Sequence, residues 1–405
     1  MSDSMKEPLY RKIMHYLIDK IENGELKEDD QVPTEAELAE RFEVSRITSR
    51  RALEELRHQG LIYRKRGGGS FVSPKQTVPR SADAAEATGR PEMIALVLPC
   101  EATVGKLSDY IQGANNYLEN TNYFLTVHDT GMNLEDEKNV IEDLVAKGIK
   151  GIIFYPFSDR DNLQLLYDLH MAHYPIVTID KYFESVPVSY VVSDNLDGGY
   201  QAARHLLRHG HERVAFICSE GIESATSIRN RYFGYCHALK EAGLPIDPEI
   251  VVMGVRRLRE EWIRARGIEG GLPKPVMEPH YKQFMKELLQ KLLDLRVTAI
   301  QTDDDYIAVE AISAALELGI KVPDELSVIG FDNIELSAHI EVPLTTIEQN
   351  SFAIGRIAAE IVVKGIETAA HECRKIVQPV KLIERSSCGK AVAATKKGGG
   401  GPESS

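Results

Sequence analysis

The sequence predicts an α/β protein in which a small N-terminal helical unit precedes two similar lobes, each built on a doubly wound parallel sheet. Short apolar runs at 93–98, 151–154 and 176–179 alternate with helical patterns at regular spacing, as in sheets covered by helices on both faces. The alternation then restarts, with further apolar runs at 214–217 and 327–330. Two such halves predict a cleft in which ligands bind at the carboxyl ends of the strands.

The composition is that of a soluble globular protein. The chain has 405 residues, 43% hydrophobic and 27% charged, and contains no run of about 18 apolar residues that would span a membrane. Its first residues lack the apolar segment of a secretory signal, and its five cysteines are scattered without CxxC spacing, so we expect a cytoplasmic location with reduced thiols. The motifs GxSxG, HExxH and GxxxxGK[ST] are also absent, so we expect no enzyme, no cofactor and no metal site.

Residues 32–72 carry the pattern of two short helices followed by a hairpin. Thr34 and Glu37 have the spacing of a capping box, in which each residue caps the other at the start of a helix. Ser45 is a suitable N-cap for the second helix, and Gly60 is suited to end it. The hairpin that follows has three glycines at its tip, which predicts a two-stranded wing.

The second helix and the hairpin form a basic island on an acidic chain. Eight Lys and Arg against three Glu give residues 41–66 a balance of 8 − 3 = +5, whereas the whole chain carries −13. Arginines can bind guanine edges or phosphates, an exposed isoleucine can contact a thymine methyl, and glycines let the backbone approach a groove. The alternative is that the arginines only form a solvated helix face. Because helix spacing, basic face and wing coincide, duplex DNA is the better prediction.

Residues 8–72 resemble the GntR-type winged helix–turn–helix, a resemblance carried by PTEAELAERFEVSRITSRRALEELRHQGLIYRKRGGGSFV. Ser49 departs from the valine that is usual there. The resemblance implies an operator-binding domain at 1–72, joined by a flexible linker at 73–92 to the rest of the chain. Together with the basic pattern, it gives these expected DNA contacts: Thr34, Glu35, Ser45, Arg46, Ile47, Thr48, Arg50, Arg51, Lys65, Arg66, Gly67, Gly68 and Gly69.

Residues 93–388 resemble the LacI/GalR effector module, which is similar to periplasmic sugar-binding proteins. The matching pieces include VTIDKYF, SIRNRYFGY, TAIQTDDDYIAVEAI and VPDELSVIGFDNIELSAHI, and the fit is poor at 254–290. The resemblance implies an effector-binding and dimerisation domain, and the glycine-rich end at 389–405 is expected to be a disordered tail. The expected lobes are about 93–193 with 346–375, and 194–340 with 376–388.

The family's pattern places the effector contacts at strand ends and helix starts: Asp180, Arg231, Asp304, Asp305, Asp332 and Tyr155. Carboxylates and a guanidinium can exchange pairs of hydrogen bonds with neighbouring sugar hydroxyls. The surplus of acids disfavours a phosphorylated sugar and favours a neutral sugar, with a cation as the alternative. The alternative for Asp304 and Asp305 is that they only cap a helix, and Asp304 stands where the family usually has asparagine.

The two resemblances together imply a homodimeric transcriptional repressor, released by a sugar from an operator with two related half-sites. The same pairing of domains occurs in the arabinose-responsive repressors of Gram-positive bacteria, which this chain resembles over its whole length, so L-arabinose is the expected effector. The alternatives are a regulator that responds to another pentose or hexose, and a sugar-acting enzyme with a fused DNA-binding domain.

Overall fold

The structure, a computed structural model, describes residues 9–58, 61–65, 69–73, 92–99, 106–131, 133–267, 279–368 and 372–391. It divides into two compact units, Met1–Arg90 and Pro91–Ser405. Among the described residues, no helix is both long enough and apolar enough to cross a bilayer.

In its described part, the first unit has three helices and an antiparallel hairpin: α1 (Leu9–Glu22), α2 (Glu35–Arg41), α3 (Arg46–His58), β1 (Ile62–Lys65) and β2 (Gly69–Val72). The predicted capping box at the start of α2 is confirmed. The Glu37 carboxylate accepts from the Thr34 amide at 2.7 Å, and the Thr34 hydroxyl accepts from the Glu37 amide at 3.3 Å. Buried side chains of the helices, among them Ile13, Leu38 and Leu56, meet in one core.

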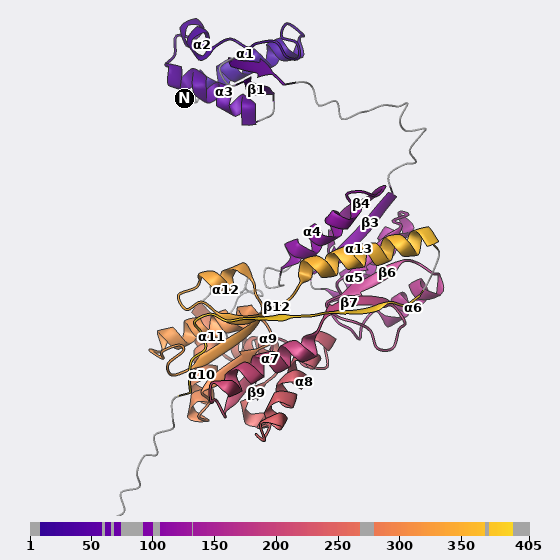
Figure 1. Cartoon of the computed structure of the whole chain (residues 1–405), viewed down its shortest axis with the longest axis vertical. Helices are drawn as coiled ribbons and strands as arrows, with labels where there is room; N and C mark the ends of the chain where they lie inside the picture. The colour runs from indigo at the N-terminus through magenta and orange to yellow at the C-terminus, as the bar shows by residue number, and fades with distance from the viewer. Residues whose placement is uncertain are drawn as a thin grey trace, which may run out of the picture. The chain divides into compact units, whose positions relative to one another are not determined.

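The first lobe of the second unit is a parallel sheet in the order β13-β7-β6-β5-β3-β4. Its strands are β3 (Glu92–Leu98), β4 (Tyr123–Asp129), β5 (Gly151–Phe154), β6 (Ile176–Ile179), β7 (Ser189–Ser193) and β13 (Lys375–Gln378). Its helices are α4 (Leu107–Leu118), α5 (Leu134–Ala146), α6 (Leu163–Met171) and α13 (Ser351–Thr368). Helices α4 and α13 pack side by side (Figure 1).

The second lobe is a sheet in the order β14-β12-β11-β10-β8-β9, parallel except for the β12–β14 pair. Its strands are β8 (Val214–Ile217), β9 (Val251–Val252), β10 (Ala299–Thr302), β11 (Ser327–Asp332), β12 (Thr345–Glu348) and β14 (Lys381–Ile383). Its helices are α7 (Asn195–Arg208), α8 (Thr226–Glu241), the 3₁₀ turn η1 (Pro248–Ile250), α9 (Val255–Ala265), α10 (Pro279–Asp294), α11 (Asp305–Glu317) and α12 (Glu335–His339).

This architecture confirms the predicted fold class, but two of the expected lobe boundaries were wrong by a few residues. Strand β12 belongs to the second lobe, although residues from 346 onward were assigned to the first, because it pairs with β11 and buries Ile347 in that lobe's core. Strand β13 belongs to the first lobe, although residues from 376 onward were assigned to the second, because it pairs with β7. The chain therefore crosses between the lobes after β7, β12 and β13.

Helices α7 and α8 approach each other backbone to backbone. A Cβ atom on Gly199 would lie 2.1 Å from the Arg231 carbonyl oxygen, and one on Gly234 would lie 2.2 Å from the Leu196 carbonyl oxygen. Both distances are far below van der Waals contact, so only glycine permits this packing. It fixes the position of α8, and therefore of the Arg231 side chain that α8 carries.

Candidate functional site

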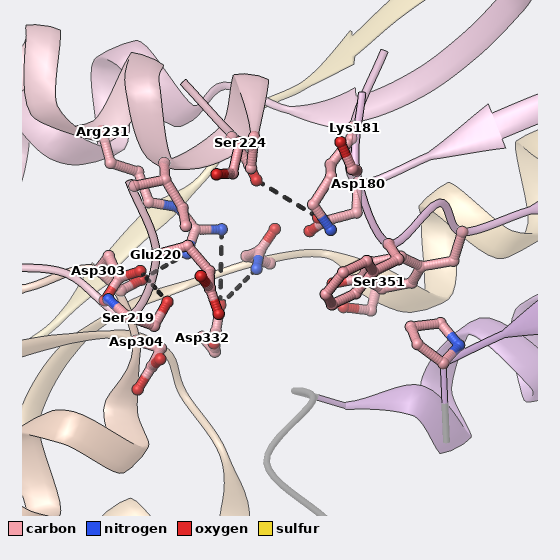
Figure 2. Close-up of a pocket in the computed structure, with 18 of the residues that line it drawn as sticks. Asp180, Lys181, Ser219, Glu220, Ser224, Arg231, Asp303, Asp304, Asp332 and Ser351 are labelled. Atoms are coloured by element: carbon pink, nitrogen blue, oxygen red, sulfur yellow. Dashed lines mark hydrogen bonds and ion pairs between the residues drawn. The ribbon is translucent and has the colours of Figure 1, made fainter. Parts of the chain in front are cut away.

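A cavity of about 230 Å³ lies between the two lobes of the second unit, at the carboxyl ends of strands from both sheets (Figure 2). Tyr155 and Asp180 follow β5 and β6 in the first lobe, Asp304 and Asp332 lie at the ends of β10 and β11, and Arg231 comes from α8. The structure thus brings five of the six expected effector residues together. The volume is below the range of about 300–1,000 Å³ typical of drug-sized ligands, so the cavity suits a small molecule such as a monosaccharide.

The sixth expected residue, Asp305, does not line this cavity. It is fully buried at the start of α11, where its carboxylate accepts from the Thr346 hydroxyl at 2.5 Å and from the Ile334 amide at 2.9 Å. Burial raises the pKa of this carboxyl to about 7. Asp305 therefore ties α11 to β12 and to the loop after β11, which is a structural role.

The Arg231 guanidinium is buried, with 5% of its surface exposed. Its Nε donates to Asn195 Oδ1 at 2.8 Å, its Nη1 donates to the Asp303 carbonyl at 2.5 Å, and its Nη2 lies 3.8 Å from Asp332 Oδ1. The guanidinium carbon of Arg231 lies 3.7 Å from the centre of the Phe331 ring. Burial opposes the charge, but the surrounding carboxylates, Asp332 first, leave the pKa of Arg231 above its ordinary value. The group stays cationic and its orientation is set on several sides.

The two carboxylates on opposite sides of the cavity are held by strained backbone. Asp180 has φ +66° and Asp332 has φ +110°, values that residues other than glycine rarely adopt and that concentrate at functional sites. Asp332 Oδ1 accepts from Gln349 at 2.5 Å, and Gln349 Oε1 accepts from the Ser193 hydroxyl at 2.5 Å. Ser193 and Gln349 lie where the chain crosses between lobes, so Asp332 is connected directly to the crossing segments.

Several charged residues that were not predicted from the sequence also line the cavity: Lys106, Asp161, Lys181, Glu220, Arg256 and Asp303. Lys181 and Asp303 are adjacent in sequence to the predicted effector residues Asp180 and Asp304, so they could have been predicted from those positions. Arg256 carried none, because it begins α9 in the segment that fits the family poorly.

The cations of the cavity are paired with acids. Lys181 Nζ lies 3.3 Å from Asp180 Oδ2 and 4.6 Å from the centre of the Tyr155 ring. Arg256 Nε lies 3.6 Å from Glu220 Oε1. Lys106 Nζ is likewise 3.8 Å from a carboxylate oxygen of Glu348. The positive charges on the cavity wall are therefore largely compensated within the protein.

Two adjacent acids lie under the second lobe's side of the cavity. Asp303 accepts from the Ser219 amide at 3.0 Å and from its hydroxyl at 2.6 Å, and it is 2% exposed. Burial, followed by the neighbouring Asp304, raises the pKa of Asp303 to about 8. Asp304 caps α11 by accepting from the Ile307 amide at 2.8 Å, and burial raises its pKa too. The buried pair therefore takes up a proton more readily than an exposed aspartate does.

This pair predicts a pH dependence of stability. Between the unfolded pKa near 4 and the folded value of about 8, the native Asp303 holds a proton that the unfolded chain has released, so the free energy of unfolding falls as pH rises through this window. Relative to the wild type, the free energy of unfolding of Asp303→Asn should rise by about 3–4 kcal/mol from pH 5 to pH 8 in denaturant titrations. Asp168→Asn, at an exposed position of α6, is the control. If the free energies of unfolding of the wild type and Asp303→Asn differ by the same amount at both pH values, the raised pKa of Asp303 would be contradicted.

The first unit presents the predicted basic face on α3. Ile47 is 81% exposed, and Arg46 and Arg50 are also exposed around it. Arg50 Nε lies 3.3 Å from a carboxylate oxygen of Glu54 on the same helix. Arg51, also expected to contact DNA, stacks on α1, with its guanidinium carbon 4.3 Å from the centre of the Tyr10 ring.

The start of α3 is fixed by short polar side chains. The Ser45 hydroxyl accepts from the Thr48 amide at 3.2 Å, as expected of an N-cap. Ser49, the departure from the family's valine, is fully buried and donates to the Glu35 carbonyl at 2.7 Å, which ties α2 to α3. The Glu35 carboxylate lies 3.7 Å from Arg64 of the hairpin.

Part of the expected wing contact lies outside the described residues: Arg66, Gly67, Gly68 and the side chain of Lys65. Gly69 is described, and its φ of +97° is one that glycine adopts without strain. In the part of the chain that the structure describes, no group of three or more His, Cys, Asp or Glu is arranged to hold a metal ion.

Comparison with known proteins agrees with these two units. Residues 9–72 match the model of bacterial regulatory proteins of the gntR family, and 94–259 match that of periplasmic binding proteins and the sugar-binding domain of the LacI family. Residues 203–388 match a periplasmic binding protein-like domain. The chain is 33% identical over 309 residues to the HTH-type transcriptional regulator DegA of Bacillus subtilis, covering 75% of this chain and 83% of that protein.

The chain belongs to the LacI-type bacterial transcription regulators and carries a GntR-type DNA-binding domain. Arabinose metabolism transcriptional repressors of Geobacillus stearothermophilus and Halalkalibacterium halodurans are each 28% identical to it, covering 95% and 97% of this chain and 99% of theirs. These relatives are regulators, in agreement with the prediction that the chain is not an enzyme.

Solved structures of LacI-type regulators share the fold. The complex of transcriptional regulator CelR with cellobiose is 22% identical, with a TM-score of 0.60 over 88% of this chain and 100% of that one. An Enterococcus faecium regulator with bound ribose is also 22% identical, with a TM-score of 0.60 over 74% of this chain and 100% of that one.

Proposed function

We propose that this chain is a homodimeric, cytoplasmic repressor of sugar-utilisation genes, which leaves an operator with two related half-sites when a neutral sugar, L-arabinose, binds between its lobes. The DNA-binding domain spans 1–72, a linker spans 73–92 and the effector domain spans 93–388. The observation that carries the proposal is a monosaccharide-sized cavity whose cations are already paired with acids.

The charge pattern supports a neutral ligand. A phosphate or carboxylate on the ligand would compete with Asp332 for Arg231, or with Glu220 for Arg256, and would also face the carboxyl group of Asp304. A sugar hydroxyl instead donates to a carboxylate and accepts from a guanidinium, forming charge-assisted hydrogen bonds without displacing either. We assign these contacts to Asp180, Arg231, Asp304 and Asp332, with Tyr155 against the sugar ring.

The choice of L-arabinose rests on relatives that contain both domains. The two arabinose metabolism repressors align with this chain almost from end to end, across the GntR-type and the LacI-type parts. Ribose is the second candidate, because a regulator of the same fold has it bound and because a cavity of about 230 Å³ suits either pentose.

The sugar acts by favouring one arrangement of the lobes over the other. Asp332 is bonded through Gln349 to Ser193, and both of these lie on segments that cross between lobes. A ligand that binds Asp332 therefore changes the position of the segments that cross between the lobes. In a dimer, this change alters the spacing between the two copies of α3 and of the wing, which carry the expected DNA contacts.

The DNA-binding face is tested with Arg50→Ala. Its guanidinium is exposed on α3, so its loss should weaken binding to an operator fragment at least about tenfold while leaving L-arabinose binding unchanged. Gel-shift titration at fixed salt measures the first, and calorimetry measures the second. Arg11→Ala, an exposed arginine of α1, is the control. Equal operator affinity for Arg50→Ala and the wild type would refute this face.

The effector site is tested with Asp332→Ala. This change removes a ligand acceptor and leaves the buried Arg231 without its carboxylate, so L-arabinose affinity should fall about 100-fold or more. The variant should bind operator normally and should not respond to the sugar in a reporter assay. Asp168→Ala, exposed on the first lobe, should be induced like the wild type. Normal induction of Asp332→Ala would exclude the assigned pocket.

A further inference from the structure

Residues 155–162, which connect β5 to α6, form much of the first lobe's side of the cavity. Tyr155, Phe157, Ser158 and Asp161 of this segment line it. The segment belongs to no helix or strand, so its shape depends on contacts with neighbouring elements. A cavity binds a small molecule tightly only when its walls are held in one arrangement, so these contacts bear on effector binding.

The Glu137 carboxylate of α5 holds the segment at two points. Its Oε2 accepts from the Phe157 amide at 2.8 Å, and its Oε1 accepts from the side-chain amide of Asn162 at 2.8 Å. Glu137 is 1% exposed and does not line the cavity. Burial raises the pKa of this carboxyl, and the two hydrogen bonds oppose the rise. Each carboxylate oxygen therefore has a donor from the segment, one near its middle and one at its end.

The conformation of Asn162 agrees with this contact. Asn162 is the N-cap residue of α6, but its side chain does not cap that helix, and its backbone is left-handed, with φ +55°. Asparagine tolerates this region better than most residues. Its side chain is directed to α5 instead, where it also donates to the Leu134 carbonyl at 3.2 Å. The contact with α5 thus takes the place of the capping bond that asparagine usually makes.

A further contact holds the segment from the cavity side. Lys181 Nζ donates to the Pro156 carbonyl at 3.0 Å, in addition to its ion pair with Asp180. Lys181 follows β6 and lines the cavity, whereas Glu137 lies on α5 behind the segment. The segment is therefore held from both sides, and Glu137 supplies the side that a ligand does not reach.

We propose that Glu137 is a positioning residue, which fixes the first lobe's cavity wall by holding residues 155–162 against α5. Without its two acceptors, the amides of Phe157 and Asn162 would be buried donors without partners, and the segment would rearrange to satisfy them. Effector binding would then have to order the wall, which lowers affinity. The inference rests on the proposed function for the identity of the effector, whereas the contact itself can be tested without a ligand.

The test compares Glu137→Leu with Glu137→Gln in the full chain, with L-arabinose as the probe. Leucine has about the size of glutamate but accepts no hydrogen bond. Glutamine can accept from the Phe157 amide and donate to Asn162 Oδ1 once that amide turns over, so it keeps both contacts without the charge. Calorimetry should show binding about 10- to 100-fold weaker for Glu137→Leu, and within about 3-fold of the wild type for Glu137→Gln.

Two controls separate this role from a general loss of structure. Operator affinity without sugar, measured by gel shift, should be the same in the wild type and both Glu137 variants. Glu142→Leu, at an exposed glutamate of the same helix, should bind L-arabinose like the wild type. If Glu137→Leu does not fold, Asn162→Gly takes its place, because glycine adopts φ +55° without strain and removes only one of the two donors. Its L-arabinose affinity should fall about 3- to 10-fold.

Hydrogen exchange of the ligand-free protein tests the contact without any sugar. The segment 155–162 should exchange faster in Glu137→Leu, or in Asn162→Gly, than in the wild type, and α7 should exchange at the same rate in all of them. Unchanged exchange of 155–162 would overturn the inference, as would wild-type L-arabinose affinity in Glu137→Leu or equal losses in the leucine and glutamine variants. If the wild type itself does not bind L-arabinose, the proposed effector is wrong, and the exchange of 155–162 alone decides for or against the role of Glu137.

Discussion

The buried guanidinium of Arg231 is the charge on which the arrangement of the second lobe depends. Removing a cation from water costs several kcal/mol unless carboxylates and hydrogen-bond acceptors surround it. Asn195, the Asp303 carbonyl and Asp332 supply them, and the ring of Phe331 covers one face. These partners come from different elements, so α7, α8, β10 and β11 must meet at one place for the lobe to fold.

This requirement explains features that would otherwise be unfavourable. Asp332 adopts φ +110°, a strained value, in order to direct its carboxylate toward the cation. Gly199 and Gly234 bring α8 close enough to α7 for Arg231 to reach the cavity. The result is an oriented set of donors and acceptors, which a sugar can bind without reorganising the protein. Because Asp332 is also bonded to Gln349, the same set reaches the segments that link the lobes.

Much of this could be predicted from the sequence, for definite physical reasons. Strands that are buried on both faces have continuous apolar sequences, so the two parallel sheets could be predicted. The resemblance to the LacI/GalR module implied that Asp180 and Asp332 contact the effector, and their positions at strand ends agree with one shared cleft. Asp304 and Asp305 could not be distinguished, because neighbouring residues at a helix start point about 100° apart and only tertiary packing decides which one faces the cavity. The sequence also could not show to which lobe β12 belongs, because a short strand is assigned to a sheet only by the strand with which it pairs, here β11.

The most direct test of the central claim is fluorescence anisotropy of the full chain bound to a labelled operator, selected from a random duplex library and titrated with sugars at constant ionic strength. Salt must be fixed because phosphate contacts make DNA affinity strongly salt-dependent. We expect L-arabinose to release the DNA with a saturable midpoint, and its anionic oxidation product L-arabinonate to leave the complex intact. Retention of the DNA at every sugar concentration, or equal release by L-arabinonate, would contradict the account.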